Sequence, residues 1–160
     1  MYHRNETAGV SFLKLHADAN PTLNTVTAYG PGYIEVNRIR FETAIVFGAE
    51  GPVHPWPAST AADISTDLLM QACGLSSKPK DPLAFLDAGE DQPQLDPNRP
   101  EVLLVGTGAK QVMLAHSTTH PIIRAGVGVE CMSTSAAART YNILMAEGRR
   151  VIVALLTETA

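Results

Sequence analysis

Three short apolar runs in the second half of the chain constrain its fold most strongly. They span residues 101–105 (EVLLV), 126–132 (GVGVECM) and 151–156 (VIVALL). Their valines, isoleucines and leucines show little of the polar alternation of a half-buried strand, which is typical of strands that are buried on both faces. Segments that can be helical separate the runs. This order predicts a parallel βαβαβ core, in which right-handed crossovers pack the helices on the sheet.

Two helices are expected between these strands. Pro121 suits the first turn of a short helix over residues 121–125. A longer helix over about 136–147 follows a group of hydroxyl side chains that can cap it, and Gly148 can end it. Asn142 is a poor helix former, so we expect its side chain to bond a neighbouring loop. The apolar face expected for this helix consists of Ala137, Ala138, Tyr141, Leu144 and Met145.

Upstream of this core, the sequence predicts β-structure and one further helix. Residues 33–37 (YIEVN) alternate, as a half-buried strand does, and residues 41–47 (FETAIVF) return as a second strand. Asn37-Arg38 can form the turn of this hairpin, because Asn tolerates a left-handed backbone. A helix over 63–73 follows. The predicted fold class is therefore α/β, with a mixed sheet that combines the parallel core and an N-terminal β-hairpin.

The length of 160 residues fits a single domain with a sizeable core. Residues 1–24 are polar and irregular, and we expect the α/β domain to span residues 25–160. Residues 76–100 contain five prolines and several acids. A loop of this length is uncommon inside a compact domain, so we interpret the segment as an insertion.

Composition argues against several classes of protein. A formal net charge of -4 does not favour a nucleic-acid partner, which normally requires a basic face. The longest apolar run is far shorter than the ~20 residues of a membrane-spanning helix. The N-terminus resembles neither a signal peptide nor a transit peptide, so a cytoplasmic location is expected. The two cysteines are far apart in the sequence and are expected to be buried, reduced thiols.

Candidate ligand-binding residues gather at the carboxyl ends of the predicted parallel strands, where open α/β sheets bind ligands. A helix N-terminus there can bind a small anion. The candidates at these ends are Gly106, Thr107, Gly108, Ser133, Thr134 and Ser135, and the following helix adds Arg139, as a possible counter-charge, and Asn142. Alternatively, the glycines form a tight turn and the hydroxyls only cap the helix. The third glycine of a dinucleotide fingerprint and the lysine of a phosphate loop are missing.

Two further features allow a functional and a structural interpretation. Trp56, the only tryptophan, lies in a proline-rich loop (GPVHPWPAS) and can anchor a partner or fold back on the core. His116 and His120 have the spacing of metal ligands on a helix, but Pro121 and the turn-forming residues argue against a regular helix across them, and no third ligand lies nearby in the sequence. No metal site or cofactor is therefore expected. No nucleophile with an adjacent base is evident, so no catalytic residue is predicted.

The combined pattern of motifs resembles a known family. The motifs are Val105-Gly106-Thr107-Gly108, Gly126-Val127-x-Val129-Glu130, Thr134-x-x-Ala137-Ala138-x-x-Tyr141-Asn142-x-Leu144 and Glu147-Gly148-Arg149. They are similar to those of the mitochondrial respiratory complex I assembly factors and their bacterial and archaeal relatives. The resemblance implies a single α/β domain with a mixed sheet and no established activity or cofactor. It also implies binding to other assembly proteins.

The expected function is therefore that of a non-enzymatic protein-interaction or assembly-factor-like module. Its expected partners are other assembly or membrane-complex proteins, and an exposed edge of the N-terminal hairpin can pair in a homodimer. The alternative is a small-anion or metabolite-binding protein, and such a protein can be an enzyme. That alternative depends on the Gly-Thr-Gly turn and the N-terminus of the helix that follows the second core strand.

Overall fold

The computed structural model describes residues 22–75 and 95–159. Most of the predicted irregular segment at 1–24 and of the predicted insertion at 76–100 lies outside the described residues. The helices and strands are β1 (Val26–Gly30), β2 (Tyr33–Val36), β3 (Ile39–Phe41), β4 (Ile45–Gly48), β5 (His54–Pro55), the 3₁₀ helix η1 (Ala61–Asp63), α1 (Thr66–Ala72), β6 (Val102–Gly106), α2 (His116–Arg124), β7 (Gly128–Met132), α3 (Thr134–Ala146) and β8 (Val151–Leu155).

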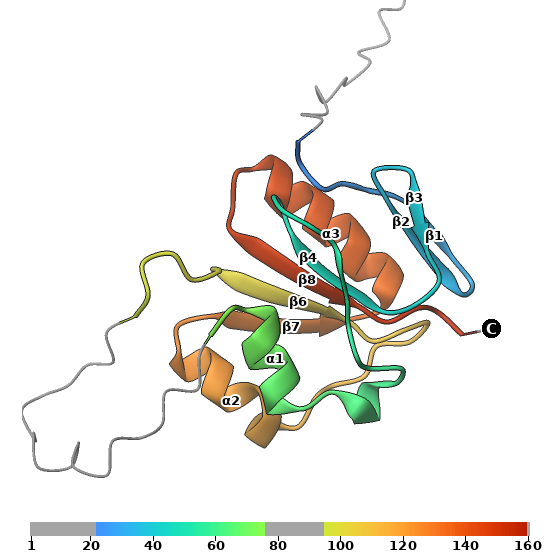
Figure 1. The fold of residues 1–160 in the computed structure, drawn as a ribbon. Coiled ribbons are helices and arrows are strands. Elements are labelled where there is room, and N and C mark those ends of the chain that lie inside the picture. The colour runs from blue at the N-terminus through green and yellow to red at the C-terminus, as the bar shows by residue number, and fades with distance from the viewer. Residues whose placement is uncertain (1–21, 76–94, 160) are drawn as a thin grey trace, which may run out of the picture.

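A five-stranded mixed sheet forms the centre of the molecule (Figure 1). Its strand order is β5-β4-β8-β6-β7. Strands β6, β7 and β8 are parallel, which confirms the predicted core, and β4 joins β8 in antiparallel orientation. The middle strand β8 and its neighbour β6 are buried over most of their length. They carry the apolar runs without alternation, as expected for strands covered on both faces.

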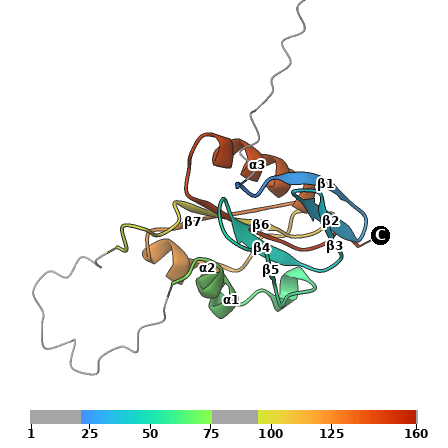
Figure 2. The same ribbon diagram turned by 45° about the horizontal axis from the view of Figure 1, so that its top comes forward.

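The two helices of the parallel core lie on opposite faces of the sheet. The chain passes from β6 through α2 to β7, and then returns through α3 across β6 to β8. Because these two steps run in opposite directions along the sheet, right-handed connections require the helices on different faces. Figures 1 and 2 show α3 on one face, and α2 on the other face together with α1.

The core has two halves that the central sheet separates. Alternate residues of β6 and β8 point to opposite faces, as the pleat of a strand requires. Leu104 and Val153 belong to the half under α3, whereas Leu103 and Ala154 belong to the half under α1 and α2. The predicted apolar face of α3 is confirmed for four of its five members, since Ala137, Ala138, Tyr141 and Met145 are buried.

A separate three-stranded sheet, β1-β2-β3, contains the predicted hairpin. Its turn is formed by Asn37 (φ 50°) and Arg38 (φ 67°). Two consecutive residues with positive φ make the type I′ turn that suits the twist of paired strands. The prediction of one continuous strand over 41–47 is wrong. The chain leaves the hairpin after Phe41, passes the exposed Glu42 and Thr43, and enters the central sheet as β4.

Helix α2 also differs from the prediction, because it begins at His116 and contains Pro121 in its interior. A proline removes one helical hydrogen bond, here the bond to the carbonyl of Ser117 four residues earlier. Ser117 is exposed, so water can bond that carbonyl. The burial of Ile122 and a hydrogen bond from the Thr66 hydroxyl of α1 to the Thr118 carbonyl (3.1 Å) hold the helix in place.

Helix α3 joins the two sheets through Asn142. The side-chain amide of Asn142 donates to the Val26 carbonyl (2.8 Å) and accepts from the Val26 N–H (2.9 Å). It thereby pairs with both backbone groups of one residue of β1, on the edge that faces away from β2. The expectation that Asn142 bonds a neighbouring segment is confirmed, with a strand in place of a loop.

Tyr141 and Asn24 extend this connection. The Tyr141 hydroxyl donates to the Asn24 carbonyl (2.9 Å), and the Asn24 amide donates to the carbonyls of Gly48 and Gly51 (2.9 Å each). The Tyr141 ring packs edge-on against Phe47, with ring centroids 5.0 Å apart. Burial raises the pKa of the Tyr141 hydroxyl, so it remains protonated and can donate.

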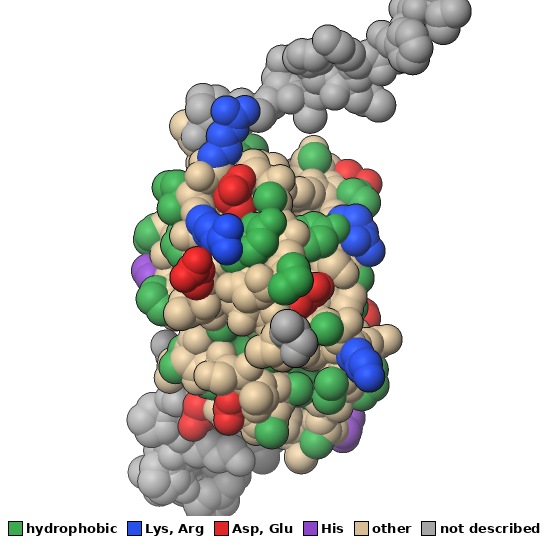
Figure 3. Space-filling view, turned by 90° about the vertical axis from the view of Figure 1, so that its right-hand side faces the viewer, with side chains coloured by type: hydrophobic (Ala, Val, Ile, Leu, Met, Phe, Trp, Pro, Cys, Tyr) green, Lys and Arg blue, Asp and Glu red, His purple; other side chains and the backbone are tan. Residues whose placement is uncertain are grey.

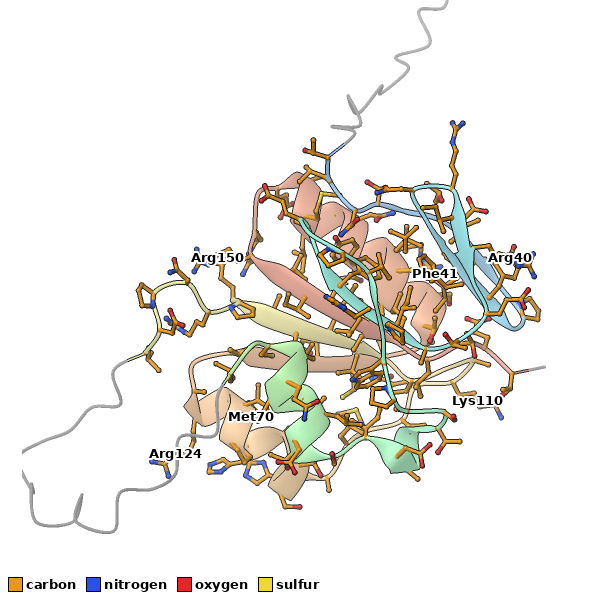
Figure 4. All side chains as sticks on the ribbon, viewed as in Figure 1. Arg40, Phe41, Met70, Lys110, Arg124 and Arg150 are labelled. Atoms are coloured by element: carbon orange, nitrogen blue, oxygen red, sulfur yellow. The ribbon has the colours of Figure 1, made fainter. Side chains whose placement is uncertain are left out.

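The outer edge of the hairpin is short and charged. Strand β3 has three residues, and Arg40 forms an exposed ion pair with Glu42 (3.3 Å) and stacks over the Tyr33 ring at 4.0 Å. Figure 4 shows where Arg40 and Phe41 lie on this strand. Short charged edge strands disfavour pairing between chains. Dimerisation through this edge therefore stays a prediction. The short, charged strand β3 does not favour it.

The face seen from the right of Figure 1 carries acidic and basic side chains interspersed with hydrophobic ones (Figure 3).

Within residues 22–75 and 95–159, none of the helices is long and apolar enough to cross a membrane.

Replacing Asn142 by Ala is expected to lower the free energy of unfolding by about 1–3 kcal/mol, because both backbone groups of Val26 lose their partner. The better helix propensity of Ala offsets up to about 0.7 kcal/mol of this cost. Urea unfolding followed by circular dichroism measures the change. The matched control is Ile143→Ala, the next residue of α3, whose side chain is 59% exposed. An equal effect of both substitutions would contradict the proposed connection.

Candidate functional site

The structure brings the Gly-Thr-Gly turn and the Ser-Thr-Ser cap together, as their positions at the strand ends predict. The Gly108 N–H donates to the Thr134 hydroxyl (3.0 Å), and the Thr134 N–H donates to the Gly108 carbonyl (2.8 Å). The Thr134 hydroxyl in turn donates to the Leu156 carbonyl (2.6 Å). The turn, the helix and the end of β8 are thus connected through one side chain that is 1% exposed.

Gly106 explains why a glycine is needed at this point. A Cβ atom added there would lie 2.9 Å from the Cα atom of Thr134 and 2.7 Å from a methyl group of Leu155. The backbone of Thr134 cannot move aside without disturbing α3, so only a residue without a side chain allows this approach. The glycine lets the helix pack against the strand end, and the space between them is filled.

Further polar groups of the two segments are also bonded within the protein. The Thr107 N–H donates to the Met132 carbonyl (2.9 Å), and the Thr107 hydroxyl donates to the Lys110 carbonyl (2.7 Å). Ser133 caps α3 by accepting from the Ala136 N–H (3.4 Å). These bonds agree with the alternative interpretation, in which the glycines form a tight turn and the hydroxyls cap the helix. An anion at this position would have to replace some of them.

Arg139 and Asn142 lie away from this junction. Arg139 is exposed, and its guanidinium donates to the Tyr29 hydroxyl (2.8 Å), whereas Asn142 pairs with Val26. The eight candidate residues therefore form two groups, one at the strand ends and one between α3 and β1. Lys110 and Arg150 mark the two opposite ends of the parallel strands in Figure 4.

A pocket of about 390 Å³ lies elsewhere, between the proline-rich loop and α1. Strands β4 and β8 contribute Val46 and Ile152, the loop contributes prolines, and α1 contributes Leu68, Gln71 and Ala72. Sequence reasoning missed this pocket. The available signal was a rigid loop with three prolines and a tryptophan, followed directly by a short helix. The residues that line the pocket are Val46, Phe47, Gly48, Glu50, Pro52, His54, Pro55, Trp56, Pro57, Leu68, Gln71, Ala72 and Ile152.

Trp56 lies beside this pocket with its side chain largely buried. It is 5% exposed and packs in the half of the core under α1 and α2. Its backbone N–H donates to the Ala44 carbonyl (2.9 Å), which holds the loop against the sheet. The burial agrees with the interpretation of Trp56 as a lid on the core. Its role as a partner anchor stays a prediction.

The indole Nε1 atom of Trp56 has no hydrogen-bond partner, the only such buried side-chain nitrogen or oxygen among the described residues. A buried donor without a partner costs about 1–3 kcal/mol. Buried donors without a partner are rare in native proteins, and each needs an explanation. The unbonded indole therefore marks the proline-rich loop as a candidate functional region.

A second pocket, of about 480 Å³, lies at the amino ends of the parallel strands. Asn98, Arg149 and Arg150 are among its lining residues. The backbone N–H of Arg150 donates to the exposed carboxylate of Glu101 (2.9 Å), and this bond, with the nearby Arg149 (3.7 Å), lowers the pKa of Glu101. The arginines beside this pocket are thus partly neutralised by a neighbouring carboxylate.

Both cysteines are buried and free, as expected. Burial raises the pKa of the Cys73 thiol to about 12 and raises that of Cys131 as well. Since the thiolate is the nucleophilic form, neither environment favours cysteine chemistry at neutral pH. Among residues 22–75 and 95–159, no group of three or more His, Cys, Asp and Glu side chains is placed to hold a metal ion.

The fold and these features define a mixed α/β domain whose strand-end junction is closed and whose pockets lie at other edges of the sheet. The chain belongs to the family described as a protein of unknown function (DUF498/DUF598), whose pattern matches residues 26–156. The match covers every strand and helix in the described part of the chain.

Solved structures from Bordetella are similar over most of the chain. The solution NMR structure of a Bordetella pertussis protein, described as a Mth938-like domain, is 59% identical, with a TM-score of 0.72 over 92% of this chain and 94% of that one. A crystal structure from Bordetella parapertussis is 53% identical, with a TM-score of 0.69 over 86% of this chain and 98% of that one.

A curated relative matches a shorter segment. The 13 kDa major membrane protein of Francisella tularensis subsp. holarctica is 40% identical over 52 residues, which are 32% of this chain and 42% of that protein. The chain thus spans less than half the length of this relative.

Two substitutions at Trp56 separate its packing from its unbonded N–H group. Trp56→Phe is expected to change the free energy of unfolding by less than about 1.5 kcal/mol, because it keeps most of the volume and removes an unpaired donor. Trp56→Ala is expected to cost about 3–5 kcal/mol through the cavity it leaves. Urea unfolding followed by circular dichroism compares the two. Similar costs for both variants would contradict the expectation that loss of the indole N–H is tolerated.

Stability is expected to fall at alkaline pH in a manner that depends on Cys73. The folded state raises the pKa of this thiol to about 12, so the unfolded chain loses the proton first as the pH rises above about 9. The slope for one thiol approaches about 1.4 kcal/mol per pH unit. Unfolding by urea between pH 7 and 10 should show a shallower fall for Cys73→Ala than for wild type. Parallel curves would argue against this assignment.

Proposed function

We propose that this domain is a non-catalytic protein-interaction module that assists the assembly of other proteins. The observation that carries the proposal is the open pocket between the proline-rich loop and α1. Apolar pockets with a few polar groups at the rim are the usual binding sites on protein surfaces. Here Glu50, His54 and Gln71 supply the polar groups among mainly apolar neighbours.

The walls of the pocket are rigid before any partner arrives. Pro52, Pro55 and Pro57 restrict the backbone of the loop, and the hydrogen bond from the Trp56 N–H fixes the loop to Ala44. On the other side, α1 packs on the core through Leu69, which is 0% exposed. A surface that is already in its bound shape loses little conformational entropy on binding, so even a small pocket can give useful affinity.

The partner class that we propose is a protein of a membrane-associated complex. The resemblance to complex I assembly factors supports it, and so does the name of the Francisella relative, a major membrane protein. In this proposal the domain acts in the cytoplasm, and the side chain of an exposed segment of the partner enters the pocket.

Site-specific photo-crosslinking in cells tests the proposal. One variant carries a photoreactive amino acid at Gln71 and a second variant carries it at His54. The two positions lie on opposite walls of the pocket, and both are exposed. We expect the same partner to be captured from both positions, because both face one bound segment. Mass spectrometry of the adducts identifies the partner.

The matched control is the same photoreactive amino acid at Glu42, which is exposed on the segment after β3. It should not capture that partner. Capture of different proteins from the two walls, or equal capture from the control position, would count against the pocket as an interaction site.

A further inference from the structure

The exposed face of α2 carries two histidines that are one turn apart. His116 is the first residue of the helix, and His120 follows four residues later. Residues at this spacing lie next to each other on the same side of a helix. Both side chains are exposed, and their ring centroids are 4.8 Å apart.

The structure removes one of the two reasons for which the sequence argued against a metal site here, namely the expected break in the helix. Pro121 was expected to prevent a helix across the two histidines, but α2 runs without interruption from His116 to Arg124. The helix places the opposite side, which includes Ile122, in the core, so the histidines are held on the surface by a fixed backbone.

We propose that His116 and His120 form a two-histidine site for a divalent transition-metal ion. The rings are close enough for one nitrogen of each to bind a single ion at the ~2.0–2.1 Å of an imidazole–metal bond. Imidazole ligands suit Cu²⁺, Ni²⁺ and Zn²⁺, whereas Mg²⁺ and Ca²⁺ prefer oxygen ligands. No third protein ligand is placed near the pair among the described residues, so water or an incoming group fills the remaining positions.

The positive end of the helix dipole and one arginine oppose the ion and lower its affinity. The N-terminal end of α2 lies at His116, and Arg124 follows His120 by one further turn. Both oppose a cation. Both the helix end and Arg124 are exposed, however, so water and salt screen their repulsion of the ion. The repulsion therefore weakens the two imidazole–metal bonds without preventing them.

Isothermal titration with Cu²⁺, Ni²⁺ and Zn²⁺ tests the site in the full-length chain. His3 and His16 are replaced by Ala in every protein used, because their imidazoles also bind these ions. We expect one ion per chain, with Cu²⁺ bound most tightly. His116→Ala and His120→Ala should each weaken binding by about tenfold or more, since the second imidazole acts at a high effective concentration.

The matched control keeps the number of histidines on the helix and changes their spacing. The double substitution His120→Ala with Ser117→His places the pair at adjacent residues, which do not face each other. It should bind as weakly as His120→Ala alone, whereas His54→Ala should bind as wild type. All these positions are exposed, and circular dichroism verifies that each variant is folded.

Two results would overturn the proposal. One is equal affinity of the wild-type pair and the shifted pair, which would mean that the two histidines bind independently. The other is no binding beyond that of the single-histidine variants. Arg124→Gln is expected to raise the affinity by about two- to threefold if the ion lies beside this turn of the helix.

Discussion

The pairing of one asparagine side chain with the backbone groups of one strand residue links the two sheets of this molecule, which also share one apolar core. Asn142 meets both hydrogen-bonding groups of Val26, so the side chain takes the position that a neighbouring strand would otherwise have. A sheet edge inside a protein needs such a partner, because unpaired backbone groups are costly to bury. Tyr141, the preceding residue of α3, reaches the Asn24 carbonyl in the same region. Helix α3 therefore packs on the central sheet and also closes the edge of the small sheet.

The closed junction at the strand ends follows from the same requirement that buried polar groups be hydrogen-bonded. In many open α/β sheets the carboxyl ends of the strands leave a crevice for a ligand. Here Gly106 permits direct contact with α3, and Thr134 links three segments by hydrogen bonds. The junction contributes stability in the place where related architectures keep an opening. The larger hollows are instead at the proline-rich loop and at the amino ends of the strands.

The sequence was informative wherever local rules decide the structure. The parallel strands, the Ser133 cap of α3 and the Asn37-Arg38 turn were predictable, since each depends on apolar runs or on residues with special backbone preferences. The division of residues 41–47 between two sheets was not, because it depends on which strand, β2 or β8, pairs with each half. The continuous α2 was not predicted, because proline usually interrupts a helix. The burial of Ile122, which holds this helix in place, is not visible in the sequence. The pocket was missed because its walls are distant in sequence.

The single tryptophan gives this domain a built-in optical reporter. Its indole is buried in the half of the core under α1 and α2, lies beside the first pocket and has no hydrogen-bond partner at Nε1. Fluorescence from such a ring is blue-shifted, and any group that approaches the indole N–H or any water admitted to the loop shifts it to longer wavelength. Occupancy of the pocket can therefore be followed by light emitted from the native chain, without a label.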